Sequence, residues 1–561
     1  MENILIITSA HDIPTAENIA ADFSSYKVYF FDPTLVDVIK GSVLRNTELI
    51  VWDTCPDYPT LVQSAHSHAF ALEQELDHSL RALLPDCSIM AWQHLNLYYF
   101  FMSYHWYSGL WRDVIGKLRE GKLHVFLNDN PANYYWPSFL PALLLLEQLK
   151  TWNISFFAIT YGVRPDESDV AMNLCDGNPD SESFDLLTHL PTCFYDIDYF
   201  NAELQASGKS NINIVSKYWD VALAATKNIN LIRLKDQQAL SGGQPALDVM
   251  AKQLFEKLDS LLTPYIATQS FRVRQANHLS NLYQSQLVTL YLLEQYFEHH
   301  KPGKMLLSDH DAGFHGPLMS YAEKHNIPVF VVPHAKTSDD IEFGYSNVTM
   351  LTHPMQGTPL CNGKLQRLLH FTLSYAEMFS SKSAIPSSIR KIGLLLNGLS
   401  LNGILCTDFA AYINGIKQID QWCKRSGIEL SIRCRQGQSL TEILHQAIGI
   451  ERASVQAALA GSLQAFVQSI DLCLMYDAPT NADIEFLRAG VPILNPIPAP
   501  LGKAEAATAN GDVVPRASVE DSLAMLDSFL ADTNNLHVFC NTQFANYVGL
   551  FKQSHALRHF L

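Results

Sequence analysis

Two carboxylates, Asp477 and Glu485, are separated by seven residues in the stretch 469–495, which reads SIDLCLMYDAPTNADIEFLRAGVPILN. A short apolar run, Leu472–Met475, predicts a strand that ends just before Asp477. Glu485 falls on a predicted short helix that follows a polar loop. Ligands bind at the carboxyl ends of the strands in parallel α/β sheets. The spacing therefore predicts a pocket in which both carboxylates accept hydrogen bonds from hydroxyl groups.

The loop and the turn on either side of the predicted helix carry further candidate ligand-binding residues. Thr480 and Asn481 come just before the helix, where backbone N–H groups favour anions. Both residues are also good helix caps, and that role is compatible with ligand contact. After the helix, Gly490 and Pro492 form a turn that leads into a second predicted strand, Val491–Leu494.

Two arginines, Arg433 and Arg435, close another predicted strand nearby in the sequence. Alternation along a strand places both on one face, where guanidinium groups bind phosphate through paired hydrogen bonds. Structural roles compete with ligand binding at each of these positions. The two arginines could form a pair on the surface. Asp477 could form the turn after its strand, and Glu485 could be a surface or helix-capping carboxylate.

A second group of polar residues follows three predicted strands, Lys304–Ser308, Ile327–Pro333 and Val348–Leu351. Carboxylates and imidazoles of this kind act as general bases when they lie within hydrogen-bond reach of a hydroxyl group. Asp311 is the first choice, because neighbouring histidines would set its pKa. A zinc site formed by three of the histidines is an alternative, but no local spacing motif supports it. The candidates in these loops are Asp309, His310, Asp311, His315 and His334.

The elements that must position these residues follow an α/β pattern. Short apolar runs alternate with helical segments from Asn3–Ile7 onward, which predicts parallel sheets. The segment Ala246–His300 has helical spacing of apolar residues, and 161–185 is a polar, acidic loop or insertion. The Ser-rich stretch 380–390 is the clearest domain boundary, and a new α/β pattern begins after it.

Composition excludes several classes of protein. The net charge of −17 argues against a nucleic-acid partner, since phosphate contacts need clustered Lys and Arg. The ten cysteines are scattered without a CxxC pair, which is typical of thiols in a reducing cytoplasm. The first residues predict a strand rather than a signal peptide. The aromatic stretch Ser88–Trp111 is too polar for a membrane span, and a membrane-surface helix stays open as an alternative to a buried one.

The segment EFLRAGVPIL, with Asp477 seven residues ahead of Glu485, resembles the donor-binding signature of GT-B glycosyltransferases. The family pattern is an acidic residue, seven others, a Glu, a small-residue turn with Gly-x-Pro and an apolar strand. The resemblance covers Lys391–Leu530 well and 305–352 weakly. The weaker region is similar to capsule- and surface-polysaccharide transferases.

The resemblance implies an α/β fold with two Rossmann-like domains that face each other across a cleft. We expect an N-terminal acceptor-side domain at 1–385 with a helical insertion at about 186–300. A donor-binding domain would follow at 386–520, and the C-terminal helices at 521–561 would pack back on the interface.

The resemblance also implies site roles. Glu485 would bind the nucleotide ribose, Asp477 would lie near the sugar hydroxyls, and Thr480 with its loop would meet the diphosphate. We expect no cofactor, because the nucleotide sugar is a substrate. We also expect no resident metal, and cations such as Arg433 and Arg435 would then stabilise the leaving diphosphate.

The expected activity is metal-independent sugar transfer to a glycan, lipid-linked or protein acceptor, for bacterial polysaccharide or glycoprotein. A peripheral association with the membrane or with a biosynthetic complex stays open. One alternative is a nucleotide-sugar epimerase of the UDP-N-acetylglucosamine 2-epimerase type. Another is a non-catalytic subunit that binds the nucleotide sugar.

Overall fold

The structure is a computed structural model of the 561-residue chain. Asp309, His310, Asp311, His334 and Asn481 lie outside the residues that it describes. The described residues are 2–44, 46–51, 57–81, 87–90, 92–118, 121–128, 139–162, 185–189, 197–209, 211–214, 229–232, 245–266, 268–298, 301–308, 315–332, 347–352, 368–372, 386–397, 399–401, 403–435, 439–477, 480, 482–498 and 513–561.

The chain divides into two compact units, each assembled from segments that are distant in sequence. Unit 1 comprises Met1–Ser64, Phe100–Val163 and Ser374–Lys552. Unit 2 comprises Ala65–Tyr99, Arg164–Leu373 and Gln553–Leu561. Helices α3 (Tyr58–Leu80) and α4 (His94–Leu118) therefore contribute residues to both units. Neither these helices nor the others described are long and apolar enough to cross a membrane.

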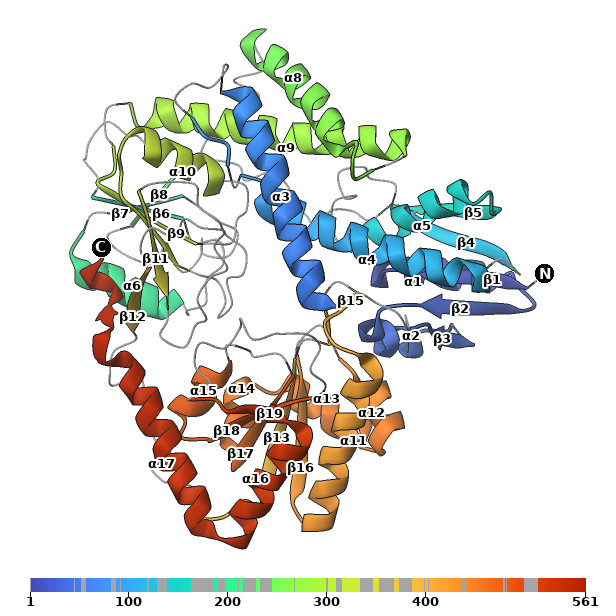
Figure 1. The fold of residues 1–561 in the computed structure, drawn as a ribbon, viewed down its shortest axis with the longest axis vertical. Helices are drawn as coiled ribbons and strands as arrows, with labels where there is room; N and C mark the ends of the chain where they lie inside the picture. The colour runs from blue at the N-terminus through green and yellow to red at the C-terminus, as the bar shows by residue number, and fades with distance from the viewer. Residues whose placement is uncertain are drawn as a thin grey trace. The chain divides into compact units, whose positions relative to one another are not determined.

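Unit 1 contains a first parallel sheet in the strand order β3-β2-β1-β4-β5 (Figure 1). Its central strand β1 is an apolar NILII segment in which Leu5, Ile6 and Ile7 are completely buried, as expected for a parallel strand covered on both faces. The bounds are β1 Asn3–Ile7, α1 Ile13–Ala20, β2 Tyr26–Phe30, α2 Val36–Gly41, β3 Thr47–Leu49, β4 Lys122–Asn128, α5 Leu140–Thr151 and β5 Phe156–Tyr161.

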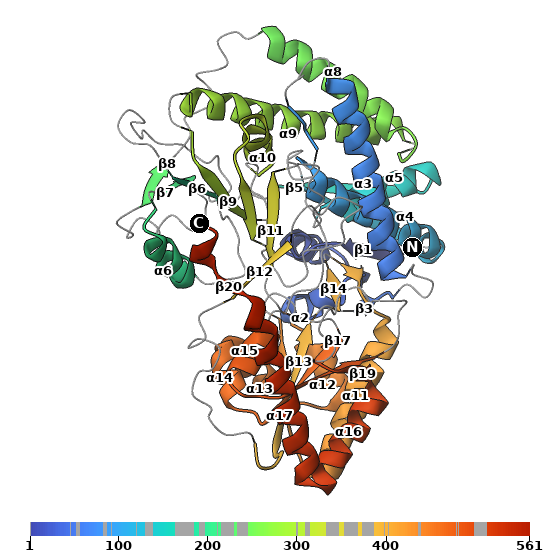
Figure 2. The same ribbon diagram turned by 60° about the vertical axis from the view of Figure 1, so that its left-hand side comes forward.

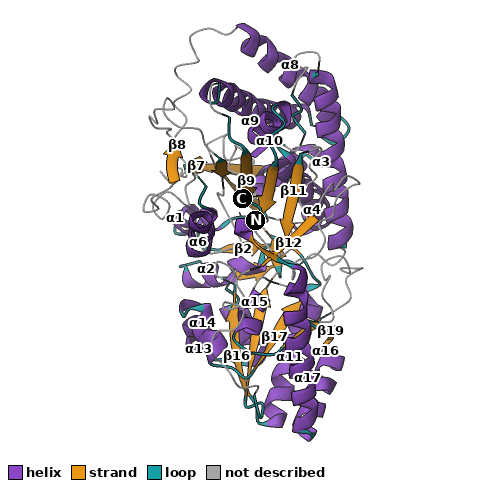
Figure 3. Ribbon diagram, turned by 90° about the vertical axis from the view of Figure 1, so that its left-hand side faces the viewer, coloured by secondary structure: helices purple, strands orange, loops and turns teal. Residues whose placement is uncertain are grey.

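Unit 1 also contains a second parallel sheet, in the order β16-β13-β17-β18-β19. Figure 3 shows helices on both of its faces, with α13 and α14 on one side and α11, α16 and α17 on the other. Helix α11 begins at a cap in which Asp408 accepts a hydrogen bond from the Ala411 N–H (2.6 Å), and it ends at Gly427 with φ +67°. The bounds are β13 Lys391–Asn397, β14 Ser400–Leu401, β15 Ile404–Leu405, α11 Phe409–Ser426, β16 Glu429–Cys434, α12 Thr441–Ile448, α13 Arg452–Ala460, α14 Leu463–Gln468, β17 Leu472–Asp477, α15 Ala482–Arg488, β18 Ile493–Ile497, β19 Arg516–Ser518, α16 Val519–Ala531 and α17 Thr533–Leu550.

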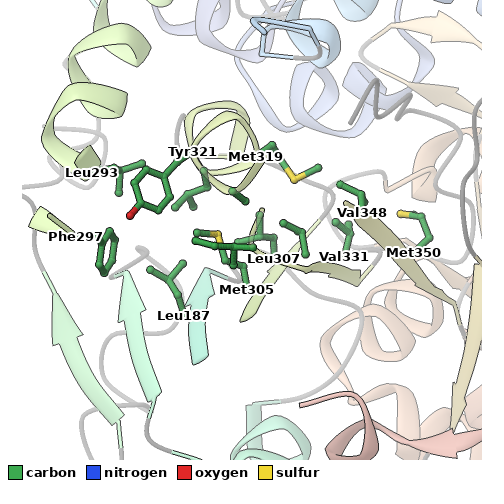
Figure 4. Close-up of a cluster of buried hydrophobic side chains, with 14 residues drawn as sticks. Leu187, Leu293, Phe297, Met305, Leu307, Met319, Tyr321, Val331, Val348 and Met350 are labelled. Carbon is green, nitrogen blue, oxygen red and sulfur yellow. The ribbon is translucent and has the colours of Figure 1, made fainter. Parts of the chain in front are cut away.

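Unit 2 is built on a third parallel sheet, in the order β20-β12-β11-β10-β9-β6-β7-β8. Its bounds are β6 Leu186–His189, α6 Ile197–Ser207, β7 Asn211–Ile214, β8 Ile229–Ile232, α8 Pro245–Leu262, α9 Gln269–Tyr296, β9 Lys304–Ser308, α10 His315–Lys324, β10 Val329–Val332, β11 Val348–Thr352, β12 Leu368–Thr372 and β20 His555–Ala556. Helices α9 and α10 pack on this sheet around an apolar core (Figure 4). The labelled core residues are Leu187, Leu293, Phe297, Met305, Leu307, Met319, Tyr321, Val331, Val348 and Met350.

The predicted α/β class with parallel Rossmann-like sheets is confirmed. The described residues form three parallel sheets, one more than the predicted pair, and a small antiparallel sheet of β14 and β15. The segment at about 186–300, which we predicted to be a helical insertion, contains α8 and α9 but also supplies strands β6, β7 and β8 to the third sheet. Alternation of apolar runs locates strands without naming their partners, so the sequence does not show that strands before residue 385 divide between two sheets. The domain boundaries at 385 and 520 stay predictions.

Candidate functional site at the carboxyl edges of the unit 1 sheets

The central strand β17 delivers Asp477 to the carboxyl edge of the second sheet. Residues 472–476 of the strand are completely buried, and Asp477, its last residue, is 8% exposed. Asp477 has a φ of +67°, so its backbone leaves the extended conformation at this residue. Asp tolerates the left-handed region better than most residues, but such a conformation still costs on the order of 1 kcal/mol. A strained, buried carboxylate at a sheet edge is a candidate for binding or catalysis.

The charge of Asp477 is set by its surroundings. Burial raises the pKa of this carboxyl to about 7, and the positive charge of Arg516 on β19 opposes that effect. Burial also raises the pKa of the Tyr412 hydroxyl well above its usual value, and the nearby Asp477 charge raises it further. Tyr412, on α11, meets Tyr476 edge to face, with ring centroids 4.9 Å apart. The edge of β17 therefore combines a carboxyl that titrates near neutrality, a guanidinium and a phenol.

Glu485 has a different environment from Asp477. The neighbouring residues Ile484 and Phe486 on α15 are buried, whereas the Glu485 side chain is 53% exposed. It forms an ion pair with Arg488 one turn later on the helix, at 3.6 Å. The structure therefore places Glu485 on the solvent-facing side of α15, and the predicted pocket shared with Asp477 stays a prediction.

Arg433 and Arg435 are not equivalent in the structure. Arg433 is 7% exposed, and its Nη1 donates hydrogen bonds to the carbonyl oxygens of Ala458 and Gly461, the second at 2.8 Å. These carbonyls lie at the end of α13, where a cation satisfies backbone acceptors and complements the helix dipole. Arg435 follows β16 and is exposed. The Nη1 atom of Arg433 thus already bonds to the backbone, and phosphate binding by the two arginines stays a prediction.

Two further described candidates, Thr480 and Gly490, shape the start and the end of α15, whereas His315 is the buried first residue of α10. The Thr480 hydroxyl accepts a hydrogen bond from the Ala482 N–H (3.4 Å), and the Thr480 carbonyl accepts one from Asp483 (3.2 Å). Gly490, with φ +72°, ends the helix in the left-handed conformation that favours glycine. These contacts agree with the capping and turn roles considered from the sequence.

The first sheet places a second buried carboxylate at its own carboxyl edge. One oxygen of Asp12 accepts hydrogen bonds from the Thr8 N–H (2.8 Å), the Thr8 hydroxyl (3.1 Å) and the Ser9 N–H (3.0 Å). The other accepts one from the Tyr161 hydroxyl at the end of β5 (2.7 Å). Burial raises the pKa of Asp12 to about 6. His11, in the same loop, stacks on Phe139 with ring centroids 5.3 Å apart.

Sequence reasoning did not single out this Asp12 group. Its signal was present in the motif Thr8-Ser9-Ala10-His11-Asp12 directly after the first strand. In the structure, Ser9 and Asp12 form a capping box at the start of a short helical turn. A polar, acidic loop after an apolar strand predicts a site at Asp309–His315, and the same pattern is present at Thr8–Asp12.

Hydrogen bonds join the carboxyl edges of the two sheets within unit 1. The Asp37 carboxylate, on the helix after β2, accepts hydrogen bonds from the backbone N–H groups of Thr441 (2.8 Å) and Glu442 (2.8 Å), at the start of α12. The Ser439 hydroxyl also donates to Asp37, and the Ser400 hydroxyl donates to Asp32 (3.0 Å). Figures 1 and 2 both show α2 beside α12. The loops after β2 thus contact the loops after β13 and β16.

The chain was compared with known proteins. No family model and no curated protein sequence matches it. Among solved structures, it is similar to the glycosyltransferase SnogD from Streptomyces nogalater, over 66% of this chain and 95% of that one, with 12% identity and a TM-score of 0.34. MurG from Acinetobacter baumannii is similar over 66% and 95% of the two chains, with 14% identity and a TM-score of 0.32. A UDP-N-acetylglucosamine 2-epimerase is similar over 66% and 95%, with 10% identity and a TM-score of 0.33.

Glycosyltransferases of the GT-B class are thus among the proteins to which this chain is structurally similar, as the sequence resemblance led us to expect. At these TM-scores the similarity assigns neither a family nor an activity.

Proposed function

We propose that this protein is a glycosyltransferase that takes a sugar from a nucleotide-activated donor, and that the second sheet of unit 1 holds the donor. The observation that carries the proposal is the position of Asp477. It is a strained, buried carboxyl at the end of a central parallel strand, within the Asp477-x7-Glu485 pattern that precedes Gly490-x-Pro492. Ligands of parallel α/β folds bind at this edge.

The residues at the edge suit the parts of a nucleotide sugar. With a pKa of about 7, Asp477 can either accept a hydrogen bond from a sugar hydroxyl or donate one. Glu485 is exposed on α15, so its carboxylate can accept hydrogen bonds from a ribose. Arg516 adds a cation beside Asp477 that complements a diphosphate. Arg435 is the further cation proposed from the sequence. We propose that the acceptor binds to the N-terminal part of the chain, residues 1–385.

The donor-site assignment is tested by a thermal-shift screen of the full chain against UDP, GDP, CMP, CDP and dTDP sugars. Glu485→Ala should lose most of the affinity for the nucleotide sugar that stabilises the wild type, and its melting temperature without ligand should stay near wild type because the side chain is exposed. Glu451→Ala is a matched control, since Glu451 is exposed and its side chain does not cap α13. Equal nucleotide affinity in both variants would refute the role of Glu485.

The nature of the reaction is tested by product analysis. Transfer requires an acceptor, whereas an epimerase converts the nucleotide sugar alone. Conversion of donor to an isomeric nucleotide sugar without acceptor would replace the proposed transferase by the epimerase. Binding without turnover across glycan, lipid-linked and protein acceptors would identify a non-catalytic subunit.

For the general base we propose Asp311, with His310, His334 and Asp309 as the alternatives in order. Asp311→Asn should lower turnover by roughly 100-fold or more, because a positioned base contributes about that factor, and should leave donor binding unchanged. The comparison of kcat with donor Kd in this variant is the measurement. Normal turnover in this variant would show that the general base is one of the neighbouring residues.

Treatment with a chelator should leave transfer unchanged, since the proposed diphosphate contacts are cationic side chains.

A further inference from the structure

We propose that Asn495 is a positioning residue for the donor site, which fixes the backbone that presents the Asp477 carboxyl. The inference rests on the proposed function and adds a residue that does not contact the donor. The Asn495 Nδ2 donates two hydrogen bonds, to the carbonyl oxygens of Met475 (2.5 Å) and Asp477 (3.0 Å). The Asp477 carbonyl belongs to the residue in the left-handed conformation, and the Met475 carbonyl lies two residues before it in the same strand.

The position of Asn495 explains why its amide reaches both carbonyls. Strands β17 and β18 are paired with Leu474 opposite Leu494, so Asn495 lies beside Met475 near the carboxyl end of the ladder. The next residue on β18 is Pro496, which has no N–H group to continue the pairing. The side chain of Asn495 is 2% exposed and supplies donors where the backbone does not. Its removal would leave two buried carbonyls without these donors.

The two hydrogen bonds connect the backbone conformation with the environment of the carboxyl group. In an extended strand, successive side chains point to opposite faces, so relaxation of Asp477 toward an extended conformation would reorient its side chain. Arg516 on β19 acts on its charge, and the Asp477 charge in turn raises the pKa of Tyr412 on α11 and of the adjacent Tyr476. A reoriented carboxyl would leave these groups and meet more water.

Gln543 on α17 offers a matched control. It is also a 2% exposed amide that binds the backbone of β18, because its Nε2 donates to the carbonyls of Ile493 (2.8 Å) and Val513 (2.6 Å). Its Oε1 accepts a hydrogen bond from the Ile493 N–H (2.9 Å). Gln543→Ala thus removes buried amide–backbone hydrogen bonds on the same strand without touching Asp477.

The experiment compares Asn495→Ala, Gln543→Ala, Asp477→Asn and the double variant of Asn495 and Asp477 in the full chain. Affinity is measured by calorimetry for the sugar nucleotide, from the UDP, GDP, CMP, CDP and dTDP panel, that most stabilises the wild type. Asn495→Ala should weaken binding roughly tenfold or more, because misplaced site groups lose affinity, while Gln543→Ala should bind like wild type. In the Asp477→Asn background, removal of the Asn495 amide should have little further effect. Equal losses in the two alanine variants, or additive losses in the double variant, would overturn the proposal.

A second readout does not depend on the ligand. Thermal unfolding of the same variants is followed as a function of pH, since the buried Asp477 makes stability fall as the carboxyl ionises. Asn495→Ala should reduce this pH dependence and Gln543→Ala should retain it. Identical pH dependence in both variants would overturn the positioning role of Asn495. This readout needs no ligand, whereas absence of binding by every sugar nucleotide would refute the proposed function.

Discussion

At the scale of single residues, Asp477 is a buried, strained carboxyl at the end of a strand, whereas Arg433 is a buried guanidinium that donates to backbone carbonyls. Both were candidates in the sequence, where Asp477 follows a predicted strand and Arg433 closes one. The structure separates them by partners: the Arg433 guanidinium donates to carbonyls at the end of α13, whereas Asp477 is held in a left-handed conformation beside Arg516 and Tyr412. Local sequence shows which residues can do chemistry, and tertiary contacts determine which ones already have a structural partner.

The raised pKa of Asp477 gives a prediction about stability and pH. Because its pKa rises from 3.8 to about 7 on folding, the folded chain keeps a proton between these values that the unfolded chain releases. Stability is therefore lost as the pH rises through this range, by roughly 2 kcal/mol between pH 5 and pH 7. Asp477→Asn cannot ionise, so its melting temperature relative to wild type should increase steadily over that interval. Asp12, with its pKa near 6, is present in both proteins and cancels in the comparison. A difference that does not change with pH would contradict the buried state of Asp477.

At the scale of elements, many strands and helices were predictable from apolar runs, but their contacts were not. Strands Asn3–Ile7 and Lys304–Ser308 have the predicted bounds, and the strand before Asp477 is two residues longer than predicted. The start of α12, in contrast, has no side-chain cap of its own. Asp37, distant in the sequence, accepts hydrogen bonds from its first N–H groups. No local pattern around Thr441 could reveal this partner.

The cap on α12 gives a prediction about the contact between the first two sheets. Asp37→Ala should lower the free energy of unfolding by about 1–2 kcal/mol, the usual effect of removing a helix cap. Asp37→Asn should restore only part of this loss, because both Asp37 oxygens accept backbone N–H groups and an amide keeps one acceptor oxygen. Asp22→Ala, which removes an exposed carboxylate from the same sheet region, is the control. Thermal unfolding of the three variants is the measurement. A melting temperature for Asp37→Ala equal to that of Asp22→Ala would show that the cap does not stabilise the chain.

At the scale of the whole molecule, the α/β class was predictable, whereas the assembly of each unit from segments distant in sequence has no local signal. Unit 1 brings together the segments around β1–β5 and β13–β19, and the strands between them form the sheet of unit 2 together with β20 from the end of the chain. The sequence suggested that the loops after β9 and β10 would complete the donor site. The described contacts of unit 1 join the second sheet to the segment after β2, at Asp32 and Asp37, and the role of the loops after β9 and β10 stays a prediction. Strand pairing between distant segments depends on packing that periodicity does not encode.

The central claim is that a nucleotide sugar binds at the carboxyl end of β17, and a calorimetric titration tests it most directly. The full chain is titrated with UDP, GDP, CMP, CDP and dTDP sugars, and the wild type, Asp477→Asn and the control Glu451→Ala are compared. The claim predicts that a sugar nucleotide binds the wild type and the control equally and binds Asp477→Asn roughly tenfold or more weakly, through the lost carboxyl contact. Absence of binding across the panel, or equal affinity in Asp477→Asn, would contradict it.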